Sequence, residues 1–304
     1  MPIQPKIHGG HLLRVMGCCL FLFICTIAMG QTKRALLIGI SDYPQESIEC
    51  WANIHGSNDV YMLSATLKKQ GYKTKTVTNK SATASNIRKQ LNAFVGSCKP
   101  GDCVYLHFSC HGQPVEDLDG DEEDGWDEAI IPYDAEKGYE TGRYEGENHI
   151  LDDELSGYFT RIRTAIGAKG FLCVVIDACH AGGSSRGEED DEDVEPICRG
   201  TKTGFSSSGK TYTPRINAKG HFTIEQTANQ SNILILEACR SYQSNYEIKQ
   251  EGQYYGSLSY YINQVLKEQT MNSSLNWVSK VKEKMDTDKR LIRQNMVYET
   301  SMKE

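Results

Sequence analysis

Residues 171–183 read Phe-Leu-Cys-Val-Val-Ile-Asp-Ala-Cys-His-Ala-Gly-Gly, a continuous apolar run followed by a short polar and glycine-containing stretch. An apolar run of this length with such a boundary is typical of a strand that is buried on both faces. Four further short runs indicate similar strands, at residues 35–40, 73–77, 103–108 and 233–237. The sequence therefore predicts a set of short buried strands spread along most of the chain.

Segments with helical periodicity separate or follow these strands. Apolar side chains recur at intervals of three and four in residues 58–70, 85–95, 152–166, 257–268 and 275–285. Strands that alternate with helices predict an α/β fold, with a mainly parallel central sheet flanked by helices on both faces. In such sheets ligands bind beyond the carboxyl ends of the strands, so the residues after each apolar run are candidates for a functional site.

The composition excludes several classes of protein. The 304 residues are 39% hydrophobic and 24% charged, which is typical of a globular chain with a sizeable core. The formal net charge of −7 argues against a nucleic-acid partner, because such proteins need a basic face to displace counterions from phosphates. Eleven cysteines without paired C-x-x-C spacing argue against a small disulfide scaffold and against a zinc ribbon.

Residues 1–30 have the features of a signal peptide. Lys6 and Arg14 precede an apolar stretch at residues 15–28, and the small residues that end it fit a signal-peptidase site before Gln31. The stretch is shorter than the roughly 20 residues that span a bilayer, which disfavours an uncleaved anchor. We therefore expect an exported protein, periplasmic or extracellular, with no stable membrane association after cleavage.

The rest of the chain is expected to form one domain, residues 31–270, with a helical extension of the same domain at residues 271–304. Two long loops interrupt the pattern of strands and helices, at residues 112–149 and 182–223. Loops of this length are usually functional or disordered. The second contains six consecutive acidic residues, 188–193, which are typical of a solvated segment. None of these features indicates an oligomeric state.

Two of the predicted strands end near a histidine and a cysteine. His111 follows the run at 103–108, and Cys179 follows the run at 171–176. The carboxyl ends of parallel strands meet at one edge of a sheet, so these side chains can meet there as a thiol nucleophile and its base. For either residue alone a structural role, as a buried thiol or a hydrogen-bonded imidazole, is the simpler alternative. A metal site is a third alternative, although the spacing matches no common ligand set.

The residues around these strand ends resemble the motifs of caspase-like cysteine peptidases (peptidase family C14), most closely those of the metacaspase branch. The similarity runs in the family's order from about residue 33 to 265, and its motifs are ALLIGI (35–40), NDV (58–60), SCHG (109–112), GDEEDGWDE (120–128) and DACHAG (177–182). The resemblance implies a caspase-like fold and a cysteine endopeptidase. It assigns His111 as the base, Cys179 as the nucleophile, and the backbone N–H groups of Gly112 and Cys179 as the oxyanion hole.

Charge near the cysteine predicts the specificity. Aspartate-cleaving caspases have glutamine two residues before the nucleophile, whereas this chain has Asp177. An acidic side chain there repels an acidic substrate residue and attracts a basic one. By the resemblance, Asp59 and Ser109 join Asp177 in the subsite for the residue before the cleaved bond. We therefore expect polypeptide substrates that are cleaved after Arg or Lys.

The resemblance also suggests calcium as a regulatory ion. Asp127, Asp152 and Asp153 match acids of the family's calcium site, and carboxylate oxygens are ligands that calcium prefers. The family pattern has another acid seven residues after the nucleophile, where this chain has Arg186. We therefore expect that the protein requires no cofactor, and regulation by calcium is left open.

Arg186, Arg199 and Lys202 are basic residues that lie after the nucleophile in the second long loop. A protease specific for basic residues could cut its own chain there, and solvated surface charge is the alternative. Two further functions use the same fold. One is an inactive caspase-like binding module, against which the presence of both His111 and Cys179 argues, and the other is a cysteine-dependent transpeptidase or ligase.

Overall fold

The computed structural model describes residue 1 and residues 31–46, 50–120, 122–180, 197–214, 222, 224 and 226–302. The predicted signal peptide, apart from Met1, and the acidic run of the second loop lie outside these ranges. The chain divides into two units, Met1–Gly30 and Gln31–Glu304, and every described helix and strand belongs to the second. No helix in the described ranges has both the length and the apolar character needed to cross a membrane.

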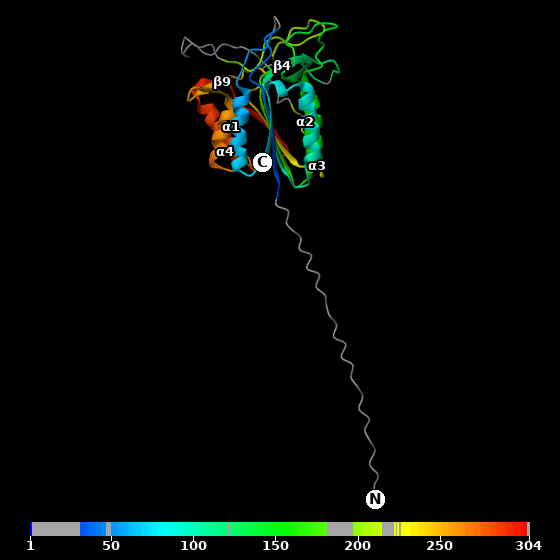
Figure 1. Cartoon of the computed structure of the whole chain (residues 1–304), viewed down its shortest axis with the longest axis vertical. Helices are drawn as coiled ribbons and strands as arrows, with labels where there is room; N and C mark the ends of the chain where they lie inside the picture. The colour runs from blue at the N-terminus through cyan, green and yellow to red at the C-terminus, as the bar shows by residue number, and fades with distance from the viewer. Residues whose placement is uncertain are drawn as a thin grey trace. The chain divides into compact units, whose positions relative to one another are not determined.

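A six-stranded sheet in the order β11-β8-β7-β3-β1-β2 forms the centre of this unit (Figure 1). Its parallel strands begin and end within two residues of the predicted runs, and they are β1 (Lys33–Gly39), β2 (Lys73–Thr78), β3 (Cys103–Ser109), β7 (Phe171–Asp177) and β8 (Asn232–Glu237). The edge strand β11 (Val297–Thr300) is antiparallel to β8. The prediction of a mainly parallel central sheet is therefore confirmed.

Helices cover both faces of the sheet (Figure 1). On one face lie α1 (Gly56–Lys69), α4 (Ser257–Glu268) and α5 (Asn276–Thr287), and on the other lie α2 (Ala84–Ser97) and α3 (Asp152–Ile166). Alternate residues of a strand point to opposite faces. In β1, Leu36 and Ile38 pack against the layer of α2 and α3, whereas Ala35 and Leu37 pack against that of α1 and α4. Burial on both faces explains the continuous apolar runs.

Two parts of the prediction need correction, and one hairpin lies where the sequence analysis made no prediction. The first long loop contains β4 (His111–Glu116) and β5 (Trp126–Ile131), which form an antiparallel sheet with β6 (Ile150–Leu151). A separate hairpin consists of β9 (Glu247–Gln250) and β10 (Gln253–Gly256). The C-terminal extension is not wholly helical, because β11 follows α5 and joins the central sheet. These strands are short and carry polar residues, so they lack the apolar run that revealed the others. Two 3₁₀ turns complete the described elements, η1 (Asn79–Ser81) and η2 (Lys289–Leu291).

Candidate active site

Strand register brings the predicted histidine and cysteine to one edge of the central sheet. Ser109 at the end of β3 pairs with Asp177 at the end of β7. His111 lies two residues after Ser109, and Cys179 lies two residues after Asp177. The backbones stay close beyond the sheet. A Cβ atom at Gly112 would lie only 2.7 Å from the Cys179 carbonyl oxygen, so this approach requires glycine.

The contacts of His111 leave one ring nitrogen able to accept a proton. Its Nε2 lies 2.8 Å from the carbonyl oxygen of Ala52, and since a carbonyl only accepts, Nε2 carries the hydrogen. Its buried Nδ1 has no hydrogen-bond partner among the described residues. The ring packs against Tyr43 and Trp51, and burial lowers the pKa of His111 to about 4. At neutral pH the imidazole is therefore neutral, as a general base must be.

Cys179 lies at the same edge with its thiol buried. Its side chain is shielded from solvent, and Sγ donates to the carbonyl oxygen of Gln243 at 3.1 Å. Burial raises the pKa of Cys179 well above its ordinary value, so the thiol is protonated. Because Nδ1 of His111 has no partner in the described part of the chain, the thiol and the imidazole are not hydrogen-bonded to each other in this structure.

The two backbone groups predicted to form the oxyanion hole point at a single oxygen atom. The N–H groups of Gly112 and Cys179 both donate to the carbonyl oxygen of Arg199, each at 3.1 Å. Two N–H donors converging on one carbonyl oxygen is the arrangement that stabilises a developing oxyanion in acyl transfer. The carbonyl oxygen of Arg199 therefore lies at the predicted oxyanion hole.

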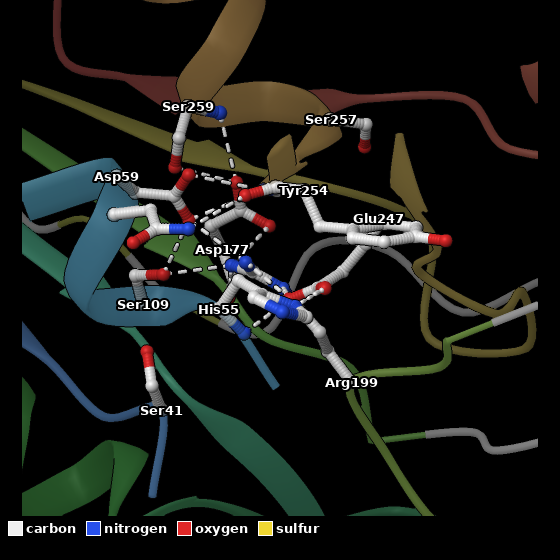
Figure 2. Close-up of polar contacts among 12 residues, drawn as sticks. Ser41, His55, Asp59, Ser109, Asp177, Arg199, Glu247, Tyr254, Ser257 and Ser259 are labelled. Carbon is white, nitrogen blue, oxygen red and sulfur yellow. Dashed lines mark hydrogen bonds and ion pairs between the residues drawn. The ribbon is translucent and has the colours of Figure 1, made fainter. Parts of the chain in front are cut away.

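The side chain of the same arginine lies among the predicted specificity residues. Arg199 has no exposed surface. Its Nη2 is 2.8 Å from Asp59 Oδ2, and its Nη1 is 2.7 Å from Ser109 Oγ and 3.4 Å from Asp177 Oδ1 (Figure 2). The structure thus brings together the three predicted subsite residues and one candidate for self-cleavage. Of the other candidates, Lys202 is exposed and Arg186 lies outside the described residues.

A third carboxylate, which the sequence analysis missed, completes the cluster. Glu247 Oε1 lies 2.8 Å from Nη2 and 3.1 Å from Nε of Arg199 (Figure 2). Glu247 begins β9, which belongs to the small hairpin and not to the central sheet. No signal in the sequence distinguishes this acid from other acids of the chain. We call Asp59, Ser109, Asp177 and Glu247 the guanidinium site.

The charges of the guanidinium site suit a cation. Burial raises the pKa of Asp59 to about 7, even though Arg199 acts in the opposite direction. Burial also disfavours ionisation of Glu247, but Arg199 and His55 outweigh it and keep the pKa of Glu247 below its ordinary value. Three buried carboxylates facing one guanidinium leave the cluster short of positive charge. An empty site would therefore attract a basic side chain strongly.

The acids predicted for calcium are not gathered in one group. Asp127 is buried in β5, and Asp152 is buried at the start of α3, where its Oδ1 accepts the N–H of Glu128 at 3.3 Å. Asp153 is exposed. The described ranges contain no group of three or more His, Cys, Asp or Glu side chains placed to hold a metal ion. Calcium binding stays a prediction, and we derive no step of the reaction from it.

Curated proteins with similar sequences are metacaspases. Metacaspase-1B of Aspergillus fumigatus is 35% identical over 162 residues, which cover 49% of this chain and 35% of the relative. Metacaspase-1 of Schizosaccharomyces pombe is 35% identical over 162 residues, which cover 50% of this chain and 34% of the relative. The chain thus spans about a third of the length of these curated relatives.

Similarity to a solved structure concerns the fold. A crystal structure of a protein from Geobacter sulfurreducens aligns with a TM-score of 0.59 at 18% identity, and the alignment covers 90% of this chain and 94% of that one. Residues 32–303 match the family model of the caspase domain, peptidase family C14. The chain therefore belongs to the caspase-domain family of cysteine peptidases.

Proposed function

We propose that this protein is a cysteine endopeptidase that cleaves polypeptides after arginine or lysine, with Cys179 as the nucleophile and His111 as the base. One observation supports this most strongly. The side chain of Arg199 lies in the guanidinium site while its carbonyl oxygen accepts the N–H groups of Gly112 and Cys179. A basic substrate residue bound before the cleaved bond would make both sets of contacts at once.

The proposed reaction proceeds through an acyl-enzyme. His111 Nδ1 takes the thiol proton, and Cys179 Sγ attacks the carbonyl carbon of the basic residue. The oxygen becomes negatively charged and is held by the two backbone N–H groups. His111 then gives the proton to the departing amine as the C–N bond breaks. A water molecule, deprotonated by His111, hydrolyses the thioester and releases the thiol.

The same contacts support self-cleavage between Arg199 and Gly200. The chain passes close to the nucleophile here. A Cβ atom at Gly200 would lie only 2.2 Å from the Cys179 carbonyl oxygen. While this bond is intact, Arg199 fills the guanidinium site and keeps substrates out of it. Cutting the bond would free the segment that begins at Gly200, so the uncut chain is a precursor with low activity.

We also propose that the chain is exported, as the features of residues 1–30 indicate, and that its mature form begins at Gln31. Purification from culture fluid or periplasm, followed by mass determination of the N-terminal peptide, tests this directly. An N-terminal peptide that retains residues 1–30 in the purified protein would contradict cleavage of a signal peptide.

Reporter peptides test the proposed activity. A protein beginning at Gln31, incubated until any self-cleavage is complete, should hydrolyse fluorogenic peptides that end in Arg or Lys and leave an Asp peptide intact. Cys179→Ala should abolish turnover and keep the fold. Cys103→Ala is a matched control, because this buried thiol lies at the start of β3, at the end of the strand opposite to the proposed site. Faster hydrolysis of the Asp peptide, or activity that survives in Cys179→Ala, would overturn the proposal.

A further inference from the structure

Glu247 contacts the part of the guanidinium group that a lysine side chain does not have. Its Oε1 accepts hydrogen bonds from both Nε, at 3.1 Å, and Nη2, at 2.8 Å. The remaining members of the guanidinium site contact only the two terminal nitrogens, Nη1 and Nη2. In a lysine side chain a methylene carbon, Cε, takes the place of Nε, and a single ammonium takes the place of the planar fork.

The carboxylate of Glu247 is also fixed in its orientation. Its side chain has no exposed surface. The backbone N–H of His55 donates to Oε1 at 2.7 Å, and the ring Nδ1 of His55 lies 2.6 Å from Oε2. The His55 ring in turn stacks on Tyr254, with the ring centroids 5.0 Å apart (Figure 2). The carboxylate of Glu247 therefore cannot turn toward water when the side chain bound in the site has no N–H group to donate to it.

We propose that Glu247 is a specificity-determining residue that makes the site select arginine over lysine. This inference rests on the proposed function and refines it. An arginine gives Glu247 two charge-assisted hydrogen bonds, whereas a lysine would place a methylene group against a buried carboxylate. Asp59, Asp177 and Ser109 serve either cation, because each of them contacts a terminal nitrogen. Loss of hydrogen bonds to a charged group predicts a preference of about 10- to 100-fold for arginine.

Reporter kinetics test this preference. Wild type should show kcat/KM at least about tenfold higher for an Arg peptide than for the matched Lys peptide. Glu247→Gln should lower the value for Arg by about tenfold or more and change the value for Lys by less than about threefold. Glu251→Gln is the control, because this exposed acid lies in the turn after β9. Equal rates on the two peptides in wild type, or an equal loss on both in Glu247→Gln, would overturn the inference.

A stability measurement separates this inference from the proposed catalysis. In a Cys179→Ala background no peptide bond is cut, and the residue at position 199 acts as a permanently bound side chain. Arg199→Lys should lower the urea midpoint when Glu247 is present and have a clearly smaller effect when Glu247→Gln is also present. The same effect in both backgrounds would refute the role of Glu247, even if the protein proves to be an active protease. Absence of all turnover in wild type would refute the proposed function. The urea midpoints of the Arg199→Lys variants would still decide whether Glu247 distinguishes arginine from lysine.

Discussion

Removing the buried guanidinium should destabilise the uncut protein strongly. Arg199→Ala, made in a Cys179→Ala background so that no cleavage occurs, leaves Asp59, Asp177 and Glu247 buried without their cation. Removing one partner from a buried ion pair typically costs about 3–5 kcal/mol, because the remaining charge has no compensation. Here three carboxylates lose the same partner. We therefore expect a loss near the upper end of that range, a large fraction of the roughly 5–15 kcal/mol that stabilises a typical domain.

The loss should also depend on pH in a defined direction. With Arg199 in place, burial already raises the pKa of Asp59 to about 7. Without the guanidinium this pKa rises further, so the folded variant holds a proton that the unfolded chain, with an ordinary pKa of 3.8, has released. The contribution of Asp59 to the stability of the variant must then fall as the pH rises from about 4 through the folded-state pKa. The difference between the two proteins should be larger at pH 8 than at pH 5.5.

Urea unfolding followed by circular dichroism measures this difference. Lys202→Ala is the matched control, because Lys202 is an exposed basic residue of the same segment and should change stability by less than about 0.5 kcal/mol. If Arg199→Ala behaved like this control at pH 8, or if its cost increased toward acid pH, the assignment of a buried guanidinium among ionised carboxylates would be wrong.

Three further outcomes are expected. Gly200→Ala should slow self-cleavage on a gel, because its Cβ would press on the Cys179 carbonyl oxygen at 2.2 Å, and an unchanged rate would contradict the position of the cut bond. Acid should lower the free energy of unfolding between pH 6.5 and 4 by up to roughly 3 kcal/mol per buried histidine. This effect opposes that of Asp59 and is larger. Equal free energies of unfolding in urea at pH 7 and pH 4.5 would refute it. The unfolded chain takes up protons over this range while three histidines, whose pKa burial lowers to about 4, stay neutral in the folded protein: His107, His111 and His149. If calcium regulates the enzyme, EGTA should slow hydrolysis of the Arg reporter and added calcium should restore it, whereas a rate insensitive to both would remove calcium from the account.

The central sheet could be predicted because its parallel strands are buried on both faces. Burial on both faces gives continuous apolar runs such as that of β7, which are visible in a single sequence. β4 begins with His-Gly-Gln-Pro and β5 contains Asp127 and Glu128, so neither shows such a run. β11 has only four residues. These strands are specified by tertiary pairing with their neighbours, which local pattern does not record.

The site could be predicted as far as it lies at the ends of central strands. His111, Cys179 and Asp177 follow from the rule for parallel sheets together with the family motifs. Glu247 could not be found in this way, because a side hairpin delivers it to the cluster. Nor could the sequence show that Arg199, among the basic residues of its loop, lies in the guanidinium site. That choice depends on the path of the loop over Cys179, which only the folded chain defines.

N-terminal sequencing of the fragments that form in the purified mature protein tests the central claim most directly. The account predicts one new N-terminus that reads Gly-Thr-Lys-Thr-Gly, from Gly200 onward, in wild type and none in Cys179→Ala. A wild-type chain that stays intact while hydrolysing the Arg reporter at full rate would contradict it, and so would cleavage at residue 199 that persists without the Cys179 thiol.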